Sequence, residues 1–240
     1  MNILRSKVRL PVALKFRGIL SLLVLAGSAA VAQAPSGGAP TSINNAFVKL
    51  FGAAGAFTAK AEALVLDQTQ QETVRMPMDF AVLDGKVRLE INMALMQGKD
   101  LPADTVAKLK QAGMDRVISV FRPDKKATCV MYPGVQTCVN IPMAKAEAEV
   151  SEKSLKLEKT ALGNETIDGH ACVKNKAVVK SDQQPIFEAV TWNAADLKDF
   201  PLQIDIKDKQ STVRMHFTQV RFVKPEAKQF DPPANYSPMK

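Results

Sequence analysis

The segment that most constrains the fold of this chain is a strict alternation of apolar and other residues on both sides of one Asp-Gly pair. Apolar residues take every second position in 74–82 and again in 87–95, and Asp84-Gly85 lies between the two runs. Alternation with period two predicts strands with one apolar face, and Asp-Gly favours the tight type I′ turn of a hairpin. Pro77 faces away from the apolar side and predicts an edge or a bulge at that point. The register that gathers the apolar residues on one face pairs Val82 with Val87, Phe80 with Leu89, Met78 with Ile91, and Met76 with Met93.

Most of the remaining chain also shows strand patterns separated by turn residues. Further strands are expected at 57–66, 117–121, 127–132, 135–141, 155–161, 171–179, 186–192, 202–206 and 213–222. In the last of these the apolar phase changes near Thr218-Gln219, which predicts a bulge. Short helices are expected at 42–51 and 103–112, and 144–151 is either a helix or a linker. The pattern predicts a curved antiparallel sheet of about nine or ten strands with one solvated face and one covered face.

The first 32 residues have the pattern of a secretory signal peptide. They hold five basic residues and no acidic one, an apolar stretch at 19–31, and the small-x-small sequence Ala30-Val31-Ala32 that precedes a cleavage site. The apolar stretch is short for a membrane span, which favours a cleaved signal over the alternative of an uncleaved anchor. We therefore expect a signal peptide at 1–32, a flexible tether at 33–42 and one domain at 43–240.

The basic charge of the chain comes largely from this first segment. The whole chain has a formal net charge of +8, and removal of the five basic residues in 1–32 lowers the excess of basic over acidic residues to 3. No nucleic-acid partner is expected from a surface of that charge. After cleavage near Ala32, the predicted location is the periplasm or the cell exterior.

The three cysteines suggest one disulfide and one free thiol in an exported chain. A hairpin folded symmetrically about Pro133-Gly134 places Cys129 opposite Cys138, at a separation that a cross-strand disulfide can bridge. Pro133 at the start of the turn is an argument against this register, because proline there favours turn types that spread the two strands of a hairpin apart. Cys129–Cys138 is therefore the candidate disulfide, and Cys138–Cys172 is the rival pairing.

The sequence offers little for catalysis or metal binding. Only two histidines are present, His170 and His216, which weighs against a multi-histidine metal site. His170 and Cys172 could form a nucleophile pair, but no third orienting residue or oxyanion motif accompanies them. Asp196 and Asp199 lie in a polar loop and are better explained as turn and capping residues. We expect no enzyme activity, no cofactor and no metal.

The apolar side of the first hairpin is rich in methionine, whose flexible side chain suits surfaces that accept variable apolar ligands. The candidate ligand lining consists of Met76, Met78, Phe80, Leu89, Ile91 and Met93. The alternative interpretation is a plain core packed under the protein's own helices, which is the more common use of such residues.

Three segments resemble signatures of the outer-membrane lipoprotein carrier (LolA-like) superfamily. They are the hairpin at 162–172, the strand–loop–strand at 191–201 that begins Thr-Trp-Asn-Ala-Ala-Asp-Leu, and the ending Phe-Asp-Pro-Pro-Ala-Asn-Tyr at 230–236. The resemblance covers most of 43–237 and implies an α+β fold: a curved antiparallel sheet that forms an incomplete β-barrel, covered by short helices. It also implies an inner apolar cavity that shelters acyl chains, whose methylene groups each cost about 0.8 kcal/mol to expose to water. No arginine of this chain can be matched to a cargo-handling arginine of the carriers.

The function predicted from these observations is that of a soluble periplasmic carrier or binding protein for an apolar ligand. The ligand would be a lipid or a lipoprotein acyl chain, and contact with a membrane would be transient. The alternative is an envelope protein-interaction or sensor module that binds a protein partner and no small ligand.

Overall fold

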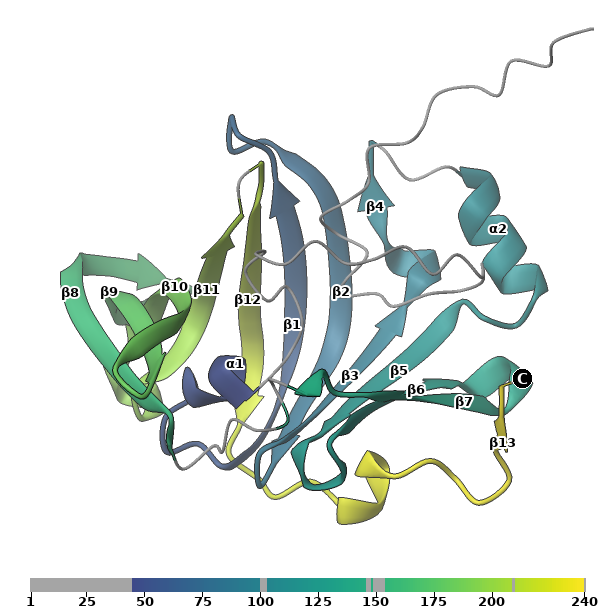
Figure 1. The fold of residues 1–240 in the computed structure, drawn as a ribbon. Coiled ribbons are helices and arrows are strands. Elements are labelled where there is room, and N and C mark those ends of the chain that lie inside the picture. Colours follow the sequence, from purple (N-terminus) through teal and green to yellow (C-terminus); the bar gives the residue numbers. More distant parts are fainter. Residues whose placement is uncertain (1–44, 100–102, 146–147, 149–153, 209, 240) are drawn as a thin grey trace, which may run out of the picture.

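The structure is a computed structural model that describes residues 45–99, 103–145, 148, 154–208 and 210–239. The described strands form one curved sheet of thirteen strands (Figure 1). The strands are β1 (Ala56–Leu66), β2 (Glu72–Leu83), β3 (Lys86–Asn92), β4 (Gln97–Gly98), β5 (Arg116–Arg122), β6 (Ala127–Tyr132), β7 (Thr137–Pro142), β8 (Lys156–Ile167), β9 (His170–Ser181), β10 (Gln184–Ala194), β11 (Phe200–Lys207), β12 (Thr212–Arg221) and β13 (Ser237–Pro238). Their order across the sheet is β13-β7-β6-β5-β3-β2-β1-β12-β11-β10-β9-β8, and β4 pairs with β2.

Helices are few in the described part of the chain. The α-helices are α1 (Asn45–Lys49) and α2 (Ala103–Gln111), and the 3-10 turns are η1 (Met93–Leu95), η2 (Pro123–Lys125), η3 (Pro133–Val135), η5 (Ala195–Leu197) and η6 (Ala227–Phe230). The fold is therefore mostly β. The curved sheet is as predicted, and all its pairings are antiparallel except that β13 lies parallel to β7. Coverage by short helices fits only in part, because α1 has five residues and α2 packs against η1.

The first hairpin forms in the predicted register. Met78 pairs with Ile91, Phe80 with Leu89, and Val82 with Val87. Asp84 and Gly85 both have positive φ angles, 49° and 78°, as a type I′ turn requires. The fourth predicted pair, Met76 with Met93, is wrong, because β3 ends at Asn92 and Met93 begins η1.

The sheet ladder is interrupted opposite Pro77. Beyond Met78 the partner of β2 is no longer β3 but β4, whose Gln97 pairs with Arg75. The three residues of η1 loop out of the ladder between the two partners. Proline has no N–H to donate, so a break at this point is consistent with the edge or bulge that the sequence predicted. The bulge predicted near Thr218-Gln219 is present: the pairing of β1 with β12 shifts there, and Gln219 has a φ of 50°.

The main core lies on one face of the sheet, which we call the inner face, and α1 packs on it (Figure 1). The ring of Phe51 from the α1 turn lies 5.1 Å from the ring of Phe57 and 5.6 Å from those of Phe80, Phe200 and Phe217. Offset and edge contacts at such distances add to the burial energy of the rings. The segment immediately before β1 thus fills the inner face over β11, β12, β1 and β2.

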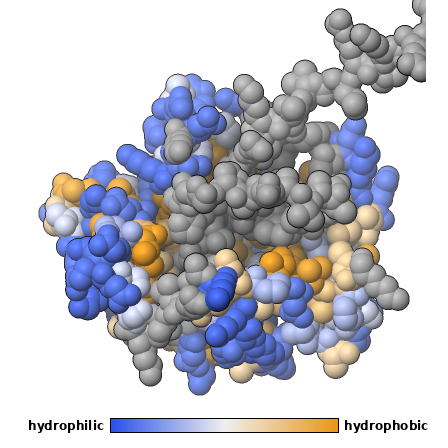
Figure 2. Space-filling model, in the orientation of Figure 1, coloured by the Kyte–Doolittle hydropathy of each residue, from blue (hydrophilic) through white to orange (hydrophobic). Residues whose placement is uncertain are grey.

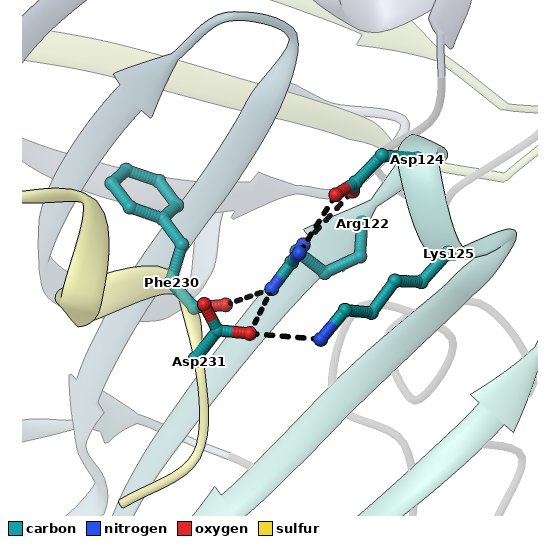
Figure 3. Close-up of polar contacts among 5 residues, drawn as sticks. All are labelled: Arg122, Asp124, Lys125, Phe230 and Asp231. Carbon is teal, nitrogen blue, oxygen red and sulfur yellow. Dashed lines mark hydrogen bonds and ion pairs between the residues drawn. The ribbon is translucent and has the colours of Figure 1, made fainter.

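A second, smaller core lies on the opposite, outer face and is covered by the C-terminal segment. Phe230 of η6 is 1% exposed and packs against apolar side chains of β5, β6 and β7. The buried Arg122 guanidinium donates to the carbonyl oxygen of Phe230 at 2.8 Å and pairs with Asp124 and Asp231, while Lys125 also donates to Asp231 (Figure 3). These contacts fix the C-terminal segment to the sheet.

The predicted Cys129–Cys138 disulfide is wrong. All three cysteines are free and buried, so the rival Cys138–Cys172 pairing is not formed either. In the observed register Cys129 pairs with Asn140, and Cys138 pairs with Met131. The reason is the turn: the loop 133–136 has its centre one residue later than assumed, and Gln136 closes it in the left-handed region with a φ of 51°.

The predicted signal peptide at 1–32 and tether at 33–42 lie outside the described residues, as does most of 144–151. Among the helices that are described, none has the length and apolar character needed to cross a membrane.

Candidate functional site

The six residues of the candidate lining lie on the inner face, as predicted, but most of them are closed off. Five are at most 5% exposed: Met76, Met78, Phe80, Leu89 and Ile91. Only Met93, in η1, is half-buried. The ring of Phe80 lies within 6 Å of those of Phe51, Phe57 and Phe217, so the protein's own side chains occupy that end. A role of these six residues in ligand binding stays a prediction.

A second part of the inner face lies further along the sheet, on β5, β6 and β7. Each of these strands directs three side chains inward, and we call the nine together the inner grid. The grid consists of Val117, Ser119 and Phe121 on β5, Thr128, Val130 and Tyr132 on β6, and Thr137, Val139 and Ile141 on β7. The strand register places them in three rows, because Ser119 pairs with Val130 and Val130 pairs with Val139. The row that contains Val117 joins the first hairpin directly, because Val117 pairs with Ile91 of β3.

Two thirds of the inner grid is half-buried. Phe121, Val130 and Tyr132 are buried. The half-buried members are Val117, Ser119, Thr128, Thr137, Val139 and Ile141. Of the nine residues, Phe121 belongs to the main core, and half-buried Met93, Met96 and Met143 also pack against that core. Figure 2 shows small groups of orange, hydrophobic atoms among blue, hydrophilic ones on the side seen in Figure 1. The inner grid itself combines three buried with six half-buried side chains.

The polar groups of the inner grid are all hydroxyls, and none of its nine residues is charged. The hydroxyls of Ser119 and Thr128 have no hydrogen-bond partner within the described part of the chain. The Thr137 hydroxyl is buried and also has no partner there. Tyr132 does have a partner, and burial raises the pKa of its phenol. The grid thus combines apolar surface with free hydrogen-bonding groups and no formal charge.

The outer face carries a different kind of surface, a charged groove with a volume of about 570 Å³. It is lined by Lys60, Ala61, Glu62, Pro77, Met78, Asp79, Glu90, Asn92, Leu95, Arg116, His216 and Thr218. Its carboxylates are already paired: Asp79 with Lys60 at 2.5 Å, Glu62 with Arg75 at 2.8 Å, and Glu90 with Arg88 and Arg116. Burial raises the pKa of Glu90, but the hydrogen bonds from the two arginines outweigh it and hold that pKa below its ordinary value.

The residues considered for catalysis are not arranged for it. The His170 ring contacts the Asp196 carboxylate at 2.6 Å. The Cys172 thiol contacts the backbone carbonyl oxygen of His170, at 3.5 Å, and does not contact the imidazole ring. Burial raises the pKa of the Cys172 thiol, whereas nucleophilic cysteines have a lowered pKa. His216, on the outer face, contacts Asp168 at 2.7 Å. Among the residues described, no group of three or more His, Cys, Asp or Glu side chains could hold a metal ion.

Sequence reasoning did not single out the inner grid. The strands at 117–121, 127–132 and 135–141 were predicted, and alternation within them identifies the inward residues. The missing information was which strands α1 covers, and a sequence pattern does not supply that.

Comparison with solved structures returns folds similar to this chain, all at low sequence identity. A LolA superfamily protein from Nitrosomonas europaea is 10% identical, with a TM-score of 0.39 over 78% of this chain and 94% of that one. The lipoprotein LppX from Mycobacterium tuberculosis is 11% identical, with a TM-score of 0.38 over 73% and 93%. A chain of the Pseudomonas aeruginosa MucA/MucB complex is 15% identical, with a TM-score of 0.37 over 80% and 60%.

No protein-family model matches the sequence, and no curated protein matches it.

Proposed function

We propose that this chain is an exported, non-catalytic carrier or binding protein that holds an apolar ligand, a lipid or an acyl chain, against the inner face of its sheet. The observation that carries the proposal is the inner grid, which is uncharged, half-buried at six of its nine positions and continuous with the apolar hairpin. The predicted signal peptide supports an envelope location, where acyl chains have to cross water.

The energetics favour such a ligand. Each methylene group that leaves water contributes about 0.8 kcal/mol, so a chain lying along the grid gains several kcal/mol before the cost of association. Met93, Met96 and Met143 at the margin can adjust to ligands of different shape, because methionine is flexible and polarizable.

The test is native mass spectrometry of the chain purified from the periplasm, with lipid extraction of the same sample. We expect a stoichiometric mass excess that extraction identifies as lipid. Bare polypeptide, with no uptake when lipid vesicles are offered, would refute the proposal.

A pair of variants on one strand locates the ligand. Ile141→Lys places an ammonium group in the uncharged grid, and we expect it to lower lipid occupancy at least about ten-fold, because a buried unpaired charge is costly. The matched control is Asn140→Lys on the same strand, which is exposed on the outer face and should leave occupancy unchanged. Equal occupancy in the two variants would place the ligand elsewhere.

A second candidate function is an envelope protein-interaction module. The observation that favours it is the charged groove on the outer face, because charged groups arranged on a surface give specificity for a protein partner of complementary charge. Charge reversal at Asp79, which is 52% exposed in its side chain, tests this function: loss of a co-purifying protein, with lipid occupancy intact, would support it.

A further inference from the structure

We propose that the C-terminal strand β13 is a cap on the edge of the sheet at β7, and that release of this cap allows β7 to pair with β7 of a second copy of the chain. This inference goes beyond the proposed function and does not depend on lipid binding. Its starting point is that the two outermost long strands of the sheet, β7 and β8, differ in what protects their edges.

The edge at β8 is protected by its own sequence. An open strand edge offers unpaired N–H and C=O groups to any other strand, and natural proteins blunt such edges with charged residues, bulges or covering segments. β8 has the first two of these features. It carries two lysines and two glutamates, and its register with β9 shifts between Ala161 and Gly163.

The edge at β7 has a covering segment instead. The segment Thr137–Pro142 contains no charged residue, and its register with β6 is continuous. Threonine, valine and isoleucine, which make up half of it, favour strands. β13 lies along its first two residues and parallel to them (Figure 1). Without β13, this strand would present the kind of uncharged edge that associates with other chains.

The cap is held by backbone hydrogen bonds at its own exposed residues. The N–H groups of Ser237 and Met239 donate to the carbonyl oxygens of Gln136 and Cys138, each at 2.9 Å. Both residues of β13 are exposed, and so is Met239. The anchor of the C-terminal segment in the second core lies upstream, at Phe230. The cap can therefore detach while that core stays closed.

The same hydrogen bonds show which groups of β7 a second copy would meet. The carbonyl oxygens of Gln136 and Cys138 point to the edge. Because the direction of hydrogen bonding alternates along a strand, the backbone groups of Asn140 point to the edge as well. An antiparallel pairing with a second β7, centred on Asn140, places Val139 of each copy opposite Ile141 of the other. Such a pairing has two-fold symmetry and closes as a dimer.

The test measures the molar mass of the purified chain by size-exclusion chromatography with light scattering, before and after release of the cap. The variant Ser237→Pro/Met239→Pro lacks both N–H groups that hold β13. We expect the wild-type chain to be monomeric and this variant to form a dimer whose fraction rises with concentration. The chain truncated before Ser237 should give the same dimer without added prolines, and it decides the case if the proline variant does not fold.

A further substitution identifies the surface through which the dimer forms. Asn140 lies on the two-fold axis of the proposed pairing, so Asn140→Lys in the uncapped chain sets two ammonium groups against each other and should restore the monomer. The matched control is Thr160→Lys, at an exposed position of β8. It adds the same charge at the other edge of the sheet and should leave the dimer intact.

Three outcomes would overturn the inference. They are uncapped chains that stay monomeric while their urea transition matches that of the wild type, a dimer that survives Asn140→Lys, and a capped wild-type chain that already dimerises through β7. None of them changes lipid occupancy, which tests the proposed function separately.

Discussion

Replacing Arg122 by methionine removes the charge that fixes the C-terminal segment to the outer face, and we expect this to lower the free energy of unfolding by about 2–3 kcal/mol. The side chain of Arg122 is 7% exposed. It donates to the Asp124 carboxylate at 2.9 and 2.7 Å, to the Phe230 carbonyl at 2.8 Å, and to Asp231 (Figure 3). Methionine keeps most of the apolar stem, so the loss is mainly one of charge and hydrogen bonds.

The magnitude follows from the exposure of the partners. A hydrogen bond from a charged donor to a carbonyl contributes about 1.5–3 kcal/mol, and the Phe230 carbonyl loses that bond. Asp124 and Asp231 are 45% and 48% exposed in their side chains, so water solvates them once Arg122 is gone, and each ion pair contributes at most about 1 kcal/mol. The full cost of about 3–5 kcal/mol that follows an uncompensated buried charge is therefore not reached.

The assay is urea denaturation, together with hydrogen exchange of the amides at 227–239. The control is Arg116→Met at the other end of the same strand. Arg116 is 57% exposed and pairs only with Glu90 among the contacts described, so its loss should cost less than about 1 kcal/mol. We expect Arg122→Met alone to speed exchange at 227–239. Equal destabilisation by the two variants, or unchanged exchange of the C-terminal segment, would refute the reasoning.

Three further predictions concern the same part of the chain. Gly134→Ala should destabilise by about 1–3 kcal/mol, because a Cβ there would lie 2.3 Å from the Gly113 carbonyl oxygen; thermal unfolding measures it, and an unchanged melting temperature would contradict the contact. Asp231→Asn should lower stability at neutral pH and have no effect in strong acid, since Lys125 and Arg122 lower the pKa of Asp231. A lowered carboxyl pKa contributes stability that is present above the unfolded value of about 4 and is lost as the pH falls through the folded value; a difference between variant and wild type that persisted in strong acid on urea titration would argue against this. Cys129 should resist alkylation at pH 8 in the native state, because burial raises the pKa of its thiol to about 11; mass spectrometry showing rapid native labelling would contradict that burial.

The sequence predicted best those features that depend on neighbouring residues. The Asp84-Gly85 turn and the register of the hairpin follow from local alternation, and they are confirmed. The Cys129–Cys138 pairing is wrong because η3 is closed by a left-handed Gln136, which moves the centre of the turn. That conformation is open to few residue types other than glycine, and glutamine does not signal it.

The hydropathy pattern of the sequence could not predict contacts between distant segments. Arg122 and Asp231 are 109 residues apart, and no periodicity links them. The motif at 230–236 was recognised, but its role, to place Phe230 in the second core and to cover β5–β7 from outside, follows only from the structure.

Chain connectivity limits the part of the inner face that α1 can cover. α1 ends at Lys49 and β1 begins at Ala56, so the six residues between them reach at most about 20 Å. From β1 to β7 the sheet spans five strand spacings, about 24 Å. A helix tethered so closely to β1 can seal the strands around it, where Phe51 meets the rings of β1, β2, β11 and β12. It cannot also cover β7, and α2 packs at η1 instead. The short tether of α1 is thus the physical reason why the described helices cover the sheet only in part.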